Sequence, residues 1–93
     1  MARLLIGCEL GKQSTADSVQ LALESWGAVR LLQSLWLLST KMDARYVNSA
    51  LQDLVEPRDS VAVVDVHPGS EWSAFGVAET ATAWLRDNIG NHP

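Results

Sequence analysis

The sequence has little cysteine and no long hydrophobic run, and each scarcity narrows what the protein can be. Its 93 residues include one cysteine, Cys8, which excludes an intramolecular disulfide and fits a reducing cytoplasm. The longest apolar stretch, residues 28–38, contains an arginine and a Gln33-Ser34 pair, so it is too short and too polar to span a membrane. The N-terminal apolar run is also too short for a signal peptide. We therefore expect a cytoplasmic protein that does not bind membranes.

Positive charge is scarce as well. Seven Lys and Arg residues stand against eleven Asp and Glu residues, which gives a formal net charge of −4. The basic residues are scattered along the chain: Arg3, Lys12, Arg30, Lys41, Arg45, Arg58 and Arg86. Binding nucleic acid without sequence preference requires a positive field. The composition therefore disfavours nucleic acid as a partner, unless folding gathers some of these residues into a local patch.

The first predicted strand carries the clearest functional signal, because it ends at an acid. The apolar core Leu4–Ile6 is followed by Glu9, and Gly7 and Gly11 bracket this acid. An acidic side chain at a strand end suits metal binding or acid–base chemistry. The same arrangement is common as a solvated strand end. Residue types alone leave both interpretations open.

Other reactive side chains give weaker signals. Cys8 is expected to be a small buried apolar side chain. The two histidines, His67 and His92, lack the spacing of a transition-metal site. Ser34 has no histidine or lysine nearby in the sequence that would activate it as a nucleophile.

Five short apolar segments predict β-strands. They cover residues 3–8, 28–32, 35–40, 60–66 and 72–77. The second and third segments are separated only by Gln33-Ser34, which predicts a hairpin with a tight turn. The fourth has four valines in seven residues and is the strongest strand signal. The fifth follows a Pro-Gly turn and is predicted as a short extra strand.

Three other segments have helical periodicity. The first begins at Ser14, with Asp17 placed to complete a capping pair, and ends at Gly27 in a left-handed conformation. The second is capped by Asp43 and stops at a proline-containing turn. The third covers residues 79–89 and ends at a glycine.

The order of these elements predicts an α+β fold of the ferredoxin-like type. It is a β-α-β-β-α-β sandwich with a short extra strand and a C-terminal helix, in a single domain over residues 1–93. Two helices cover only one face of such a sheet, yet the hairpin strands carry apolar residues on both faces. Because an uncovered apolar face is typical of an interface, we expect a homodimer. The interface candidates are Leu32, Trp36, Leu38, Trp72 and Phe75.

Four short motifs, in order along residues 4–76, resemble a known family. They are Gly7-Cys8-Glu9-Leu10-Gly11-Lys12, Leu32-Gln33-Ser34-Leu35-Trp36, Glu56-Pro57-Arg58-Asp59, and Glu71-Trp72 followed by Phe75-Gly76. The pattern is similar to that of the small bacterial proteins labelled SinR-like, which are relatives of CRISPR-associated protein two. Virulence-associated protein D, described as a ribonuclease, is a more distant relative.

The resemblance implies a ferredoxin-like homodimer in which Glu9 of each subunit lies near the two-fold axis. In CRISPR-associated protein two, the acid at this position is proposed to hold a divalent metal for phosphodiester cleavage. The same family also acts as a dimeric scaffold without that chemistry. This chain departs from the family pattern, since Glu9 and Gln33 stand where the family has aspartates. Both departures weaken the inference of a nuclease, because a longer side chain displaces the ligand and an amide removes a charge.

We therefore expect a small dimeric binding or scaffold protein without robust catalysis. Such a role is compatible with a further protein partner. The alternative is a nuclease, cutting DNA or RNA, that uses Mg²⁺ or Mn²⁺ held by paired Glu9 side chains. In that alternative, Glu9 is both the metal ligand and the catalytic residue, and Gln33 and Ser34 lie near it in the hairpin. No other cofactor is indicated.

Overall fold

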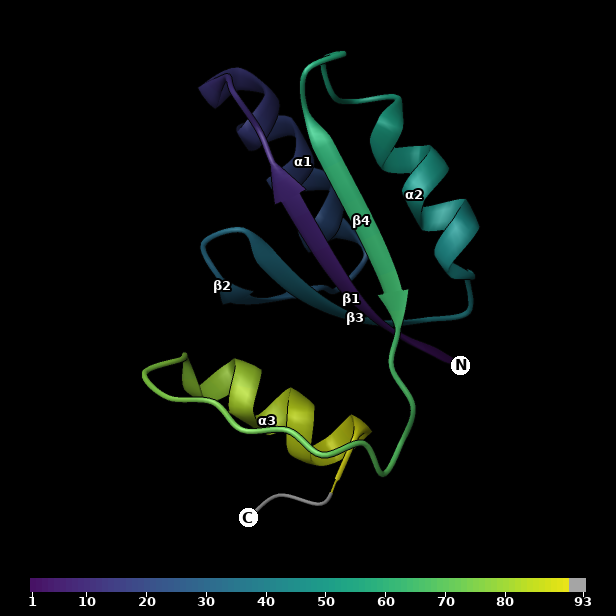
Figure 1. Ribbon diagram of the computed structural model, residues 1–93, viewed down its shortest axis with the longest axis vertical. Helices are drawn as coiled ribbons and strands as arrows, with labels where there is room; N and C mark the ends of the chain where they lie inside the picture. The colour runs from purple at the N-terminus through teal and green to yellow at the C-terminus, as the bar shows by residue number, and fades with distance from the viewer. Residues whose placement is uncertain (91–93) are drawn as a thin grey trace.

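Four strands form one antiparallel sheet, and three helices pack against it, in the computed structural model, which describes residues 1–90 (Figure 1). The strands are β1 (Ala2–Glu9), β2 (Val29–Leu32), β3 (Leu35–Thr40) and β4 (Ser60–Asp65), arranged β2-β3-β1-β4. The helices are α1 (Gln13–Ser25), α2 (Ala44–Gln52) and α3 (Glu79–Asn88). This order and topology confirm the predicted ferredoxin-like fold with its C-terminal helix.

The structure confirms two of the helix ends that the sequence predicted and contradicts a third. Asp43 caps α2 as predicted, since its carboxylate accepts a hydrogen bond from the Tyr46 N–H at 2.8 Å. Gly27 follows α1 with a φ of 85°, the left-handed conformation that favours glycine. The predicted cap at Ser14 is wrong: Lys12 occupies the N-cap position of α1, two residues earlier, and no side chain caps the helix.

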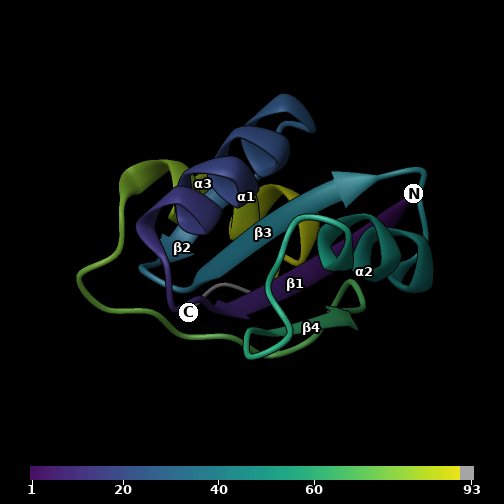
Figure 2. The same cartoon turned by 90° about the horizontal axis from the view of Figure 1, so that it is seen from above.

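One face of the sheet is closed by α1 and α2. Alternate residues of β1 and β3 point toward these helices and are buried with Val19, Leu23, Val47 and Leu51: Leu4, Ile6, Cys8, Trp36 and Leu38. Figure 2 shows α1 beside β2 and β3 and α2 beside β4, with α3 beyond the strands. This helical face holds the larger hydrophobic cluster.

The opposite face carries α3, so the expectation of a wholly uncovered face is wrong. Leu37 of β3 is buried together with Ala81, Trp84 and Leu85 of α3, and Leu5 packs against this cluster. In Figure 1, α3 lies below β2 and β3 while α1 lies above them. The third helix therefore supplies a second, smaller core on the face that the two-helix argument had left open.

α3 covers only part of this second face. Cross-strand pairing places Val29, Leu37, Leu5 and Val64 in one row, and Leu32, Leu35, Gly7 and Ala62 in the next. The first row is buried under α3 at its β2 and β3 end, but Val64 on the edge strand remains 53% exposed. We call the second row, Leu32, Leu35, Gly7 and Ala62, the open row, because no helix covers it and Leu32 is 50% exposed.

The predicted extra strand over residues 72–77 is absent from the described residues 1–90, where the sheet has four strands. The Trp72 indole N–H donates to the Gly90 carbonyl at 2.7 Å, and Trp72 and Val77 pack on the α3 cluster. Gly69 and Gly76 both have positive φ values, which bend the segment. Its apolar residues therefore anchor a loop to α3 instead of pairing with a strand.

No helix within residues 1–90 is long and apolar enough to cross a membrane. This agrees with the sequence, in which polar residues interrupt the longest apolar stretch.

Candidate functional site

The end of β1 lies beside the turn of the β2–β3 hairpin. The Cys8 N–H donates to the Ser34 carbonyl at 2.9 Å, and Glu9 pairs with Ser60 on the neighbouring strand β4. The Glu9 side chain is exposed, as are Gln33 and Ser34 in the turn. The three residues proposed from the sequence for one site are therefore close together, at one end of the sheet.

Two hollows open on either side of this strand end. One lies between α1 and the hairpin, has a volume of 460 Å³, and is lined by Glu9, Gln33 and Ser34 together with Arg30 and Trp36. We call it the α1 groove. The other has a volume of 370 Å³ and is lined by residues of the open row and by Glu9, Ser34 and Ser60. Glu9 and Ser34 thus border both hollows.

One chain does not supply a complete set of metal ligands at this place. Within residues 1–90, no group of three or more His, Cys, Asp and Glu side chains is arranged to hold a metal ion. Glu9 is the single carboxylate among the residues that line the two hollows. Since Mg²⁺ is usually held by one or two carboxylates and several waters, a second copy of the chain could add its own Glu9 to such a site.

The five interface candidates fall into three groups. Leu32 and Phe75 are accessible, and Phe75 is 100% exposed in the loop before α3. Trp36 and Leu38 are buried under α1 and α2, so a surface role for these two was a wrong prediction. The reason is the parity of β3: Trp36 and Leu38 point to the helical face, while Leu35 and Leu37 point to the other. Trp72 is half-buried against α3, and its place in an interface stays a prediction.

Cys8 and the histidines contribute little to this site. Burial raises the pKa of the Cys8 thiol above its ordinary value, which keeps the side chain neutral and unreactive. His67 is exposed in the turn after β4. His92 lies outside the described residues.

Sequence reasoning missed the pairing of Arg30 with Trp36. The Arg30 guanidinium lies 4.5 Å from the centre of the Trp36 ring, in the wall of the α1 groove. A register shift in the hairpin causes this contact, because Arg30 pairs with Trp36 while Leu32 pairs with Leu35. The extra residue between them is Leu31, which packs on the α3 side.

No sequence signal identified this bulge. A regular hairpin with a two-residue turn would place Leu31 opposite Trp36, and Arg30 would then point toward α3. The apolar residues around Arg30 would have permitted either register. The observed register has a physical advantage. It packs Val29 and Leu31 against α3, and it lets the Arg30 guanidinium reach Gln20 of α1.

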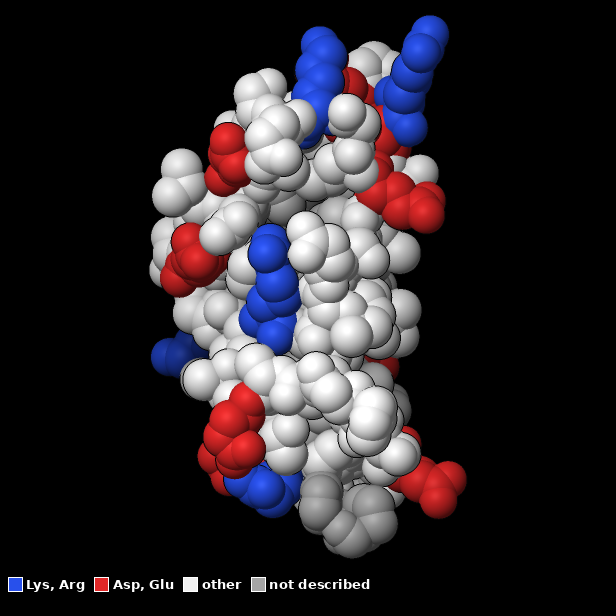
Figure 3. Space-filling view, turned by 90° about the vertical axis from the view of Figure 1, so that its left-hand side faces the viewer, with Lys and Arg blue, Asp and Glu red and all other residues white. Residues whose placement is uncertain are grey.

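Charge is dispersed over the surface that Figure 3 presents. Lys and Arg side chains stand apart from one another on this side of the molecule and alternate with Asp and Glu. No basic cluster is visible on this face.

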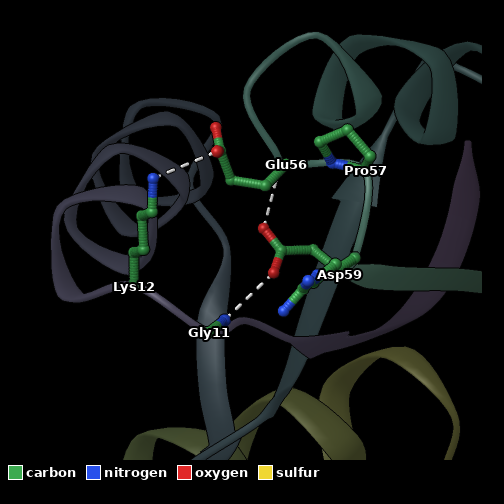
Figure 4. A pocket seen from close by; sticks show the side chains of 6 residues that line it. Gly11, Lys12, Glu56, Pro57 and Asp59 are labelled. Atoms are coloured by element: carbon green, nitrogen blue, oxygen red, sulfur yellow. Dashed lines mark hydrogen bonds and ion pairs between the residues drawn. The ribbon is translucent and has the colours of Figure 1, made fainter.

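A third hollow, of 460 Å³, lies where the loop after β1 meets the loop before β4 (Figure 4). One carboxylate oxygen of Asp59 accepts from the Gly11 N–H at 3.0 Å, and the other accepts from the Glu56 N–H at 2.8 Å. Lys12 forms an ion pair with Glu56 at 3.2 Å. Lys12, Glu56 and Asp59 are engaged with groups of this hollow, so we interpret it as a clamp that joins the two loops.

Comparison with known proteins supports the fold and leaves the function open. No protein-family model matches the sequence, and no curated protein matches it. The structure is similar to the crystal structure of a hypothetical protein, TT1823, from Thermus thermophilus, with a TM-score of 0.64 and 14% sequence identity. The match covers 83% of this chain and 95% of that chain. At this identity the likeness establishes a shared fold only.

Proposed function

We propose that the protein is a small dimeric binding or scaffold protein, with the ferredoxin-like fold of CRISPR-associated protein two and without robust catalysis. The observation that carries the proposal is the open row together with Val64, an apolar strip of sheet that α3 leaves accessible. Apolar surface of this kind, continuous across several strands, is typical of an interface. We propose that a second copy of the chain occupies it.

The edge strand β4 supports a second copy as the occupant. β4 lies at the border of the sheet and presents six residues, of which only Asp65, at its end, is charged. It has no lysine, proline or bulge of the kind that protects an exposed edge from pairing. Two such strands related by a two-fold axis pair antiparallel with themselves, which makes the contact self-complementary.

The resemblance in sequence and the composition of the site agree with this proposal. The family that the sequence motifs resemble is dimeric. The strand-end site has one carboxylate per chain, and Arg30 is the single cation among the residues that line its two hollows, whereas a grip on a nucleic-acid backbone uses several. A binding or scaffold role therefore accounts for the exposed apolar strip without requiring a catalytic centre.

Sedimentation velocity tests this proposal. We expect the wild-type protein to sediment as a dimer at about 10 to 100 µM, within the range of ordinary protein–protein affinities. Ala62→Arg adds a long charged side chain to the exposed edge of the open row and is expected to give a monomer. Ser49→Arg, on the exposed side of α2, adds the same charge elsewhere and should remain dimeric.

Two results would contradict the proposal. One is a wild-type protein that remains monomeric over this whole concentration range. The other is a dimer that Ala62→Arg and Ser49→Arg affect equally, because the contact would then lie elsewhere on the surface.

A nuclease is the second candidate, and the placement of Glu9 supports it. Glu9 follows Leu5 and Gly7 on the same face of β1, next to the open row. A two-fold axis through that face would bring two Glu9 side chains toward each other, and a divalent cation would relieve their repulsion. In this candidate function the paired Glu9 carboxylates would hold the cation, which would supply Lewis-acid chemistry for phosphodiester hydrolysis.

Cleavage assays with Mg²⁺ and Mn²⁺ separate the two candidates. We expect no robust hydrolysis of DNA or RNA by the purified dimer. Glu9→Gln keeps the size of the side chain and removes its charge. Hydrolysis that requires the cation, stops with chelator and disappears in Glu9→Gln would replace the binding role with the nuclease.

A further inference from the structure

We propose that the α1 groove is a binding site for a small organic anion, whose single carboxylate or phosphate group binds Arg30. The groove lies on the helical side of the sheet and borders the open-row hollow at Glu9 and Ser34, but its Arg30 belongs to the groove alone, so this proposal does not rest on dimerisation. Its volume of 460 Å³ falls within the range of small-molecule sites.

The positive charge of Arg30 is not balanced by a contacting carboxylate. Within residues 1–90, no carboxylate lies within 4.0 Å of its guanidinium nitrogens. Its Nε is buried and makes no hydrogen bond, and one terminal nitrogen donates to the Gln20 side chain over a long distance of 3.4 Å. A partly buried cation with unused donors gains more from an added anion than a solvated one does.

The Arg30 side chain is pre-organised by its contacts within the protein. One face of the guanidinium lies on Trp36, which is itself buried in the helical-face core. Gln20 of α1 contacts the guanidinium from the side. The strand register of the bulged hairpin fixes the backbone of Arg30 opposite Trp36. A donor held in this way loses little side-chain freedom on binding.

The other side chains that line the α1 groove combine polar and apolar groups. Amide and hydroxyl side chains line the groove near Arg30: Gln13, Gln20, Gln33 and Ser34. These groups are neutral donors and acceptors, which suit a hydrogen-bonding ligand. Trp36 and Val19 supply apolar surface below them. This mixture of apolar floor and few polar groups is typical of sites for small ligands.

The charges that line the groove limit the number of anionic groups on the ligand. Glu9 is the carboxylate of the groove and lies at the exposed end of β1, while Arg30 is its only cation. A second anionic group on the ligand would meet Glu9 and be repelled. The best match is therefore one anionic group attached to a neutral body with hydroxyl or amide groups.

Arginine side-chain NMR on the full chain tests this site. The probes are acetate, inorganic phosphate, uridine 5′-monophosphate, and uridine as the neutral counterpart, each titrated to about 20 mM, which detects even weak binding. We expect uridine 5′-monophosphate to shift the Arg30 Nε–Hε and Trp36 indole signals in a saturable way. Acetate and phosphate show which anionic group binds, and uridine alone should leave these signals unchanged.

Variants localise the effect to Arg30. Arg30→Gln should weaken binding about 10-fold or more, since it removes a charge-assisted contact. Arg3→Gln is the matched control, because Arg3 also has a buried Nε without a hydrogen bond but does not line the groove. It should leave the affinity unchanged. Thermal unfolding of each variant confirms that it is folded.

Arg30→Lys is the second variant, and it replaces Arg30→Gln in the test if that variant does not fold. It retains the charge and loses the planar pair of donors, so binding should persist at severalfold lower affinity. The proposal is overturned if no anionic probe gives saturable shifts, if uridine shifts the same signals as its monophosphate, or if the folded Arg30 variants bind like the wild type.

Discussion

The two faces of the sheet differ in how completely helices cover them. On the helical face, α1 and α2 bury the inward-facing residues Leu4, Ile6 and Leu38 fully. On the other face, α3 covers Leu37 and leaves the open row and Val64 accessible. The difference has a geometrical cause: the ten residues of α3 span about 15 Å, whereas the eight residues of β1 extend about 27 Å.

One helix appended to a two-helix sandwich thus shields a core without closing a face. The covered part of the second face contributes to stability, and the uncovered part is available for binding.

Leu37 and Leu35 provide a matched pair, because they lie two residues apart on the same strand and point to the same face. Leu37→Ala empties a position buried under α3 and should lower the free energy of unfolding by about 3 kcal/mol. Leu35→Ala lies in the half-buried open row, where it should cost about 1 kcal/mol or less in the monomer. Urea denaturation at low protein concentration measures both; equal losses would show that α3 does not divide the face.

The loop clamp at the β4 side of the molecule should have an intermediate effect. Asp59→Ala removes two hydrogen bonds, to the Gly11 and Glu56 N–H groups, and should cost about 1 to 2 kcal/mol. Lys12→Met, which removes only the exposed ion pair with Glu56, should cost less than about 0.5 kcal/mol. A larger loss from the lysine variant than from the aspartate variant would contradict this account of the clamp.

The smallest expected effect concerns Cys8, on the helical face. Burial raises its pKa above the ordinary value of 9.0, so the unfolded chain releases the thiol proton at lower pH than the folded one does. The stability that Cys8 contributes should therefore be intact below 9.0 and decline as the pH rises toward the folded-state pKa. The difference in unfolding free energy between wild type and Cys8→Ala, measured between about pH 8 and pH 10, should shrink with increasing pH.

A labelling experiment extends the Cys8 comparison to the open row. A cysteine placed by Ala62→Cys in the Cys8→Ala background should react with iodoacetamide at least about tenfold faster than native Cys8, because Ala62 is exposed. This measurement is made at low concentration, where the chains are monomeric. Similar rates for the two thiols would mean that both faces are equally closed.

Sequence patterns predicted the parts of the fold that local chemistry determines. The hairpin around Gln33-Ser34 and the Asp43 cap follow from turn and cap preferences that act over a few residues. The predicted strand over residues 72–77 failed because packing on α3 outweighed its local preference. Glu9, Gln33 and Ser34 do lie together, since the hairpin turn is bonded to the end of β1.

The coverage of the second face and the Arg30 contact depend on tertiary structure. The position of α3 follows from where its apolar residues find partners, and those partners lie far away in the chain. The bulge at Leu31 shifts the register by one residue, which reverses the side of the sheet that Arg30 faces. Trp36 and Leu38 were misassigned because alternation along β3 does not reveal which of its two sides will face α1 and α2.

Amide hydrogen exchange at two protein concentrations tests most directly the claim that the open row and β4 receive a second copy. The account predicts that raising the concentration slows exchange in residues 60–65 and around the open row, while residues of α2 exchange at an unchanged rate. It also predicts that Ala62→Arg abolishes this dependence. Exchange of residues 60–65 that stays fast and independent of concentration, in a wild-type protein that sediments as a dimer, would contradict it.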